Sequence, residues 1–141
     1  MDIDWDRLPN FTEDEIRCNC GVCGYAVMQP DFMYNIQTAR TRSGVPYNLS
    51  SGCRCWEWNL HEGGASDSRH LWIPDQELSR GWPNAVDITW ADWRNLYKIL
   101  DGLFYAGLNR IKVYRDQPHV AGWVHVDGGG PGKTPELFML G

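Results

Sequence analysis

Apolar and polar residues alternate with a period of two in several short stretches of this 141-residue chain. Because successive side chains of a strand point to opposite faces, this pattern indicates half-buried strands. It predicts strands at residues 45–50, 84–89, 110–115 and 121–127. In the second of these, Asp87 shares a face with Ala85 and Thr89. The turn-forming residues 116–119 predict that the last two strands form an antiparallel hairpin.

Two longer stretches have the 3.6-residue period of a helix. One spans about residues 31–42, with Gly44 as its end. The other is expected to begin at Thr89, with Asp92 completing a capping box, and to end at Gly107. A short helical turn is expected at residues 12–16, where Thr12 and Glu15 have the same capping spacing. These elements predict one α+β domain over residues 1–141, a small, mostly antiparallel sheet with two main helices.

Composition narrows the class of protein. Hydrophobic residues make up 43% of the chain, which includes eight Trp, six Tyr and four Phe, so the chain can build a core. The net charge of −5 argues against a nucleic-acid partner. No apolar run is long enough to span a bilayer, and the acidic start Met1–Asp6 is unlike a secretory signal peptide. We therefore expect a monomer that is made in the cytoplasm and does not bind membranes.

Five cysteines fall into two tight groups, Cys18, Cys20 and Cys23 in one and Cys53 and Cys55 in the other. The odd count leaves at least one thiol unpaired within the chain. Four of them could hold a structural zinc. A disulfide between the groups and plain packed thiols are the alternatives, and a Cys–His nucleophile pair is a more remote one.

His70, Asp87 and His125 are the candidate metal ligands. Two imidazoles and one carboxylate are a known set for catalytic zinc, which keeps a fourth position for water and lowers the pKa of that water to about 7. Taken alone, the three residues would be better explained as two partly buried histidines and a strand-end aspartate. The motifs that flank them favour the metal.

Those motifs occur in a fixed order along the chain: Ser51-Gly52-Cys53-Arg54-Cys55, then Asn59, Gly63-Gly64, Ser68-Arg69-His70, Ala85-Val86-Asp87 and His125-Val126-Asp127. The series resembles the D-alanyl-D-alanine carboxypeptidase-type zinc peptidases, which have a hedgehog-like zinc peptidase fold. The nearest branch is that of phage endolysins and murein endopeptidases. The resemblance covers roughly residues 11–127.

The resemblance implies a peptidase whose cofactor is zinc, held by His70, Asp87 and His125 on the concave face of the sheet. Its expected substrate and partner is the peptide stem of peptidoglycan. Arg54 would face a substrate carboxylate or the developing oxyanion, a role that suits a planar, permanently charged guanidinium. Ser68 would bond near the metal or the substrate amide. Such an enzyme would act on the cell wall after release, or as part of a phage particle.

The chain departs from the family pattern at three places. The Asp usually follows the first His by seven residues, but Asp87 follows His70 by 17 (87 − 70), so residues 71–84 contain an insert. We expect this insert to shape substrate choice rather than to bind metal. Cys53 replaces the usual Tyr, and Gly122 stands where several relatives have an acid.

The acid at that last position would be a natural general base, so another group must serve here. Asp127 shares a strand face with His125 and is either the acid/base group or the partner that orients His125. His119 is a second candidate for proton transfer.

Two other function classes remain open on sequence alone. One is a catalytically altered relative that binds cell-wall peptide or serves as a virion or structural component. The other is a small adaptor whose zinc is held by the cysteines alone.

Overall fold

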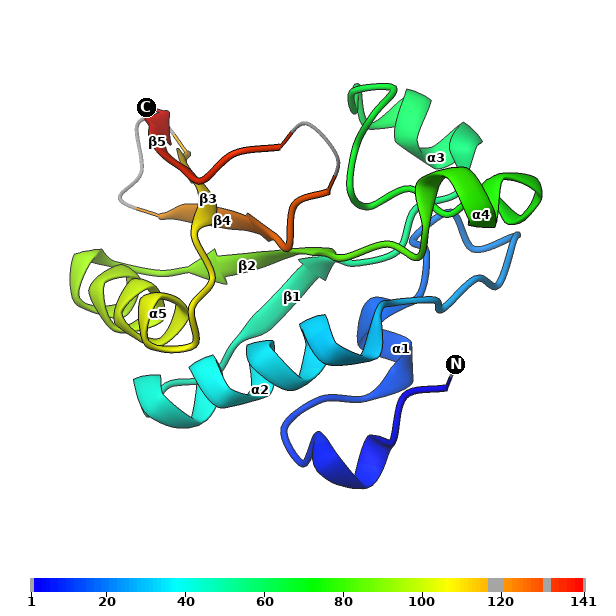
Figure 1. Cartoon of the computed structure of the whole chain (residues 1–141). Coiled ribbons are helices and arrows are strands. Elements are labelled where there is room, and N and C mark those ends of the chain that lie inside the picture. The colour runs from blue at the N-terminus through cyan, green and yellow to red at the C-terminus, as the bar shows by residue number, and fades with distance from the viewer. Residues whose placement is uncertain (1, 117–120, 131–132, 141) are drawn as a thin grey trace.

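A five-stranded sheet with the order β1-β2-β4-β3-β5 forms the centre of the molecule (Figure 1). The structure is a computed structural model that describes residues 2–116, 121–130 and 133–140. Its strands are β1 (Asn48–Ser51), β2 (Ala85–Trp90), β3 (Arg110–Arg115), β4 (Gly122–Asp127) and β5 (Glu136–Leu140). Its α-helices are α1 (Glu13–Ile16), α2 (Pro30–Ser43), α3 (Trp56–His61), α4 (Glu77–Arg80) and α5 (Trp93–Tyr105), with short 3-10 turns η1 (Trp5–Arg7) and η2 (Pro74–Gln76).

The fold is α+β, as expected, but the sheet is mixed rather than mostly antiparallel. Strands β1, β2, β4 and β3 pair antiparallel in that order, and β3 and β4 form the expected hairpin. Strand β5 then pairs parallel with β3. The last residue of β4, Asp127, and the first residue of β5, Glu136, both pair with Arg110, so the chain only has to cross the start of β3 to run parallel to it. The apolar period that defines a strand carries no information about this crossing.

The two faces of the sheet have different tasks. Val86, Ile88, Val124 and Val126 are fully buried and point toward the long helices α2 and α5, with which they form the hydrophobic core. The two helices lie together on one side of the sheet (Figure 1). Because side chains alternate along a strand, the residues between these, including Asp87 and His125, point to the opposite face. Asp87 and His125 therefore lie on the face of the sheet that the two long helices do not cover.

The helix ends agree with the sequence in two cases and differ in one. Thr12 donates its backbone N–H to the Glu15 carboxylate (2.7 Å) at the start of α1, and Gly44 ends α2 with a φ of 70°. The expected start of the last long helix at Thr89 is wrong, because Thr89 lies inside β2. Asp92 is the cap, and its carboxylate accepts a bond from the backbone N–H of Asn95 (2.8 Å). Pairing with β4 extends β2 through Trp90, so Thr89 is part of the strand and cannot cap the helix.

No helix among the described residues is both long and apolar enough to cross a membrane.

Candidate metal centre

The fold brings His70, Asp87 and His125 together. Asp87 and His125 are direct cross-strand partners in β2 and β4, and His70 comes from the loop before the insert. His70 Nε2 lies 3.2 Å from Asp87 Oδ1 and 3.2 Å from His125 Nδ1. The third side of this triangle, from His125 Nδ1 to Asp87 Oδ1, measures 3.1 Å. Three donor atoms from distant parts of the sequence thus lie around a single point.

His70 is fixed in orientation by its other ring nitrogen. Its Nδ1–H donates to the backbone carbonyl of Gly52 (2.6 Å). A carbonyl can only accept, so the proton must be on Nδ1 and Nε2 must present a lone pair to Asp87 and His125. His70 is buried, and burial lowers the pKa of its ring, with the nearby Asp87 working in the opposite direction. The neutral ring that results is the form that binds a metal.

His125 is oriented in the same way by a carboxylate. Its Nε2–H donates to Asp127 Oδ2 (2.9 Å), so Nδ1 faces the other two donors. Asp127 is held in turn by the guanidinium of Arg110 (2.7 Å) and the backbone N–H of Gly129 (2.8 Å). Burial favours a raised pKa for Asp127, but the bonds from His125 and Arg110 outweigh burial and lower the pKa to about 2. Burial also opposes charge on His125, yet Asp127 and Asp87 outweigh it and raise the pKa of that ring.

The triangle of donor atoms has the size that a zinc ion requires. Tetrahedral ligation with bonds of about 2.0–2.1 Å places neighbouring donors about 3.3 Å apart. The three separations of 3.1–3.2 Å match one face of such a tetrahedron. One proton can satisfy only one edge of the triangle, whereas one cation can satisfy all three. The residues therefore fit a zinc ion, and the set leaves a fourth position.

Arg54 contacts the same carboxylate from the side opposite the histidines. Its guanidinium donates to Asp87 Oδ2 (3.1 Å) and, through Nε, to the Ser51 hydroxyl (3.1 Å). Burial penalises the Asp87 carboxylate, but its interactions with His70 and His125 outweigh burial and lower its pKa. Asp87 thus presents one oxygen to the histidines and the other to Arg54. The sequence indicated a role for Arg54 toward substrate, but it gave no sign of this ion pair.

Asn59 on α3 and the Gly64–Ala65 loop that follows it hold Arg54 in place. The fully buried Asn59 accepts from Arg54 (3.4 Å) and donates to the carbonyl of Ala65 (3.0 Å). Gly64 packs so closely on Asn59 that a Cβ at that position would overlap the Asn59 side chain. The Asn and Gly-Gly motifs of the sequence therefore serve to place Arg54.

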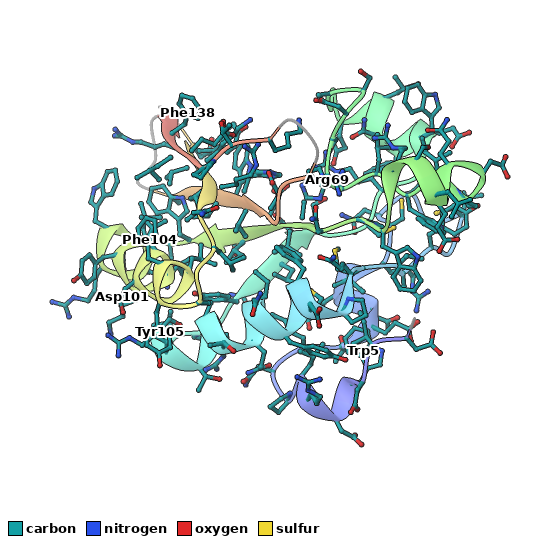
Figure 2. The ribbon with its side chains drawn as sticks, viewed as in Figure 1. Trp5, Arg69, Asp101, Phe104, Tyr105 and Phe138 are labelled. Carbon is teal, nitrogen blue, oxygen red and sulfur yellow. The ribbon has the colours of Figure 1, made fainter. Side chains whose placement is uncertain are left out.

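The donor triangle opens into a cavity of about 400 Å³. Side chains of both charges line it, and the cationic ones are Arg54, Arg69, Arg110, Lys112 and Lys133. Figure 2 shows Arg69 between the loops that follow α3 and β4. On the wall beside His125, the rings of Tyr114 and Trp123 stack with centroids 4.7 Å apart and an angle of 6° between their planes. The cavity can thus receive a flat or apolar group next to an anionic one.

Ser68 lines this cavity, and its hydroxyl accepts a bond from the backbone N–H of His70 (3.2 Å). Gly122 lies at the start of β4, where a Cβ would overlap the carbonyl oxygen of Tyr114. No side chain, acidic or otherwise, can be placed there without moving the strand. His119 lies outside the described residues.

The insert of residues 71–84 lies outside the cavity lining. None of residues 71–84 lines the cavity, so the structure gives no support to a direct role in substrate choice. The insert contains η2 and α4 and packs on itself through Trp72 and Trp82 (ring centroids 6.0 Å apart). Its last residue, Asn84, accepts from Arg69 (2.9 Å) and donates to the carbonyl of Gly129 (3.0 Å). Two ligand-bearing segments are pinned at its base, and its Arg80 contacts Ser66 (3.2 Å) and Arg69 (3.5 Å) in the loop that lines the cavity.

The arrangement agrees with what comparison with known proteins finds. No curated protein matches the chain. The family pattern described as Peptidase M15 matches residues 9–127, a range that contains all three donor residues, Arg54 and Asp127. That range covers most of the chain, so this protein belongs to the Peptidase M15 family, a family of metallopeptidases.

Proposed function

We propose that this protein is a zinc-dependent peptidase that hydrolyses an amide bond in the peptide stems of peptidoglycan. The observation that carries the proposal is the triangle of donor atoms from His70, Asp87 and His125, with both far imidazole nitrogens already engaged. A pure binding domain has no need of three lone pairs that converge on one point beside an open cavity. Zinc held there would polarise the scissile carbonyl and supply a nucleophilic water at neutral pH.

The chain's own residues account for substrate binding. Stem peptides carry free carboxylates, and the five cationic side chains of the cavity provide partners for such groups. Arg54, with its side chain 13% exposed, is the cation that reaches both the cavity and the donor triangle. A substrate carboxylate or developing oxyanion would compete with Asp87 for the Arg54 guanidinium. The stacked Tyr114 and Trp123 offer an apolar wall for the rest of the peptide.

Asp127 is better suited to orienting His125 than to moving a proton. Both of its oxygens are engaged, and a carboxylate with a pKa of about 2 is a weak base. The four acids that line the cavity are Glu62, Asp67, Asp87 and Asp127. Asp67 is paired with Lys133 (2.6 Å). Among the described residues, Glu62 at the end of α3 has only a long contact of 3.9 Å with His61, so we propose Glu62 as the acid that exchanges protons with the substrate.

The test is incubation with purified peptidoglycan and mass analysis of the released fragments. We expect the zinc-loaded protein to release stem peptides cut at one kind of amide bond, and a chelator to stop the release. His125→Ala should fold, because the core lies on the other face of the sheet, but should lose this zinc and all activity. Wall binding without release by the zinc-loaded protein would refute the peptidase and favour a binding domain. The same experiment with whole cells and with phage lysates would show whether release or a virion delivers the protein to the wall.

A further inference from the structure

Four cysteine sulfurs form a second cluster, away from the donor triangle. The Sγ atoms of Cys18, Cys20, Cys23 and Cys55 all lie within 4.8 Å of one another. The first three belong to the loop after α1, and the fourth is the cap of α3, about thirty residues later. In Figure 1 the loop after α1 rises toward the start of α3. We propose that these four thiolates bind a structural zinc ion, separate from the metal of the cavity.

The spacing of the sulfurs fits tetrahedral ligation. Zinc–sulfur bonds of about 2.3 Å place the four sulfurs of such a site about 3.8 Å apart. A disulfide would instead bring two of them to about 2.05 Å and leave the other two out. All five cysteines of the chain are free in the structure, and the four sulfurs gather as one group instead of as pairs.

Each of the four sulfurs also accepts a backbone N–H. Cys18 accepts from Cys55 N (3.3 Å), Cys23 from Tyr25 N (3.4 Å) and Cys55 from Trp58 N (3.5 Å). Cys20 accepts two such bonds, from Val22 N (3.3 Å) and Cys23 N (3.2 Å). Four thiolates and one zinc ion carry a net charge of −2. Amide dipoles aimed at the sulfurs offset that charge, which neutral packed thiols would not require.

The turns after Cys20 and Cys23 are built for this arrangement. Gly21 has a φ of 74° and Gly24 a φ of 69°, a conformation that costs little only without a side chain. Each turn bends the chain back so that the next amides point at the preceding sulfur. Arg17, at the end of α1, donates to the carbonyl of Gly24 (2.9 Å) and thereby ties the second turn to that helix.

Cys53 provides the contrast within the same segment. It is buried like Cys18 and Cys55, yet its sulfur is not among the four that gather. It lies between Gly52, whose carbonyl orients His70, and Arg54. A metal on Cys55 would therefore anchor one end of segment 52–55, which orients His70 and carries Arg54.

The experiment counts zinc per chain and does not depend on peptidase activity. We expect the parent protein, loaded with zinc and dialysed, to contain about two zinc ions per chain. His125→Ala and Cys20→Ala should each retain about one, and the double variant none. Cys53→Ala is the matched control and should retain both. An unchanged zinc content in Cys20→Ala, or loss of a zinc ion from Cys53→Ala, would overturn the proposal.

A second readout identifies the ligands. Cobalt loaded into His125→Ala should give the intense sulfur-to-metal absorption of tetrahedral thiolate ligation, and Cys20→Ala with His125→Ala should not. Thiol titration of the denatured, unreduced parent should find all five thiols, whereas a smaller number would indicate a disulfide and refute the site. If peptidoglycan is not cut while two zinc ions are bound, the proposed function fails and the thiolate site stands. If only the zinc of the cavity is found and peptidoglycan is cut, the thiolate site fails and the proposed function stands.

Discussion

Asp127 lies two residues after His125 on β4 and accepts the Nε2–H of that histidine at 2.9 Å. Because residues two apart share a face of a strand, a single strand supplies both the metal-facing ring and the group that orients it. Arg110, the cross-strand neighbour of Asp127, then fixes the carboxylate from β3. The orientation of His125 is thus set by the pairing of β3 with β4.

Replacing Asp127 by Asn tests this relationship. The amide keeps the size of the side chain but loses the charge that holds the His125 ring, so we expect zinc affinity at the cavity to fall about 10- to 100-fold. Competition with a chromophoric chelator measures the affinity. Asp75→Asn, on the exposed part of the insert, is the control and should bind zinc like the parent. Equal affinities in the two variants would remove Asp127 from the support of the metal.

Arg54→Lys separates charge from geometry. Lysine keeps the positive charge but cannot contact Asp87 and a substrate group with one planar fork. We expect the variant to hold its full zinc content and to lose about 10²-fold in kcat/KM, the effect typical of one lost oxyanion donor. Arg42→Lys, an exposed residue on α2, is the matched control. Parent-like turnover would reduce Arg54 to a structural partner of Asp87.

Glu62→Gln tests the proposed proton exchange. The amide cannot accept a proton, so kcat should fall by about 10²- to 10⁴-fold while zinc content and unfolding temperature stay unchanged. The control is Glu57→Gln, which is exposed on the same helix and outside the cavity. If both variants cut peptidoglycan like the parent, another group exchanges the proton.

Gly122→Ala tests why this chain lacks an acid before its last donor histidine. Even a methyl group there would overlap the carbonyl oxygen of Tyr114, so we expect a loss of about 1–3 kcal/mol in the free energy of unfolding. Urea denaturation measures it. In Gly130→Ala the new methyl would meet only the Arg69 guanidinium, which can move, and the loss should be smaller. An unchanged stability in Gly122→Ala would mean that β3 and β4 can separate locally to admit a side chain.

The sequence predicts most accurately what depends on neighbours along the chain. Strand β3 has the expected bounds because Ile111 and Val113 alternate with polar residues. The start of α5 was wrong because Thr89 is claimed by a strand partner far away in sequence. The parallel pairing of β5 and the approach of Cys55 to the first three cysteines likewise depend on the path of the chain in space. The ion pair of Arg54 with Asp87 joins residues that no periodic pattern links.

The sheet order also determines when the donor triangle can form during folding. Strand β4 can pair with β2 only after the chain has passed through α5 and β3, so Asp87 and His125 meet across a separation of 38 residues. Because the loop-closure entropy of such long-range contacts must be met before they form, we expect the triangle to be absent from the folding transition state. A metal bound there should then slow unfolding and leave the refolding rate unchanged. The cavity metal would thus add to the kinetic stability of a fold that assembles without it.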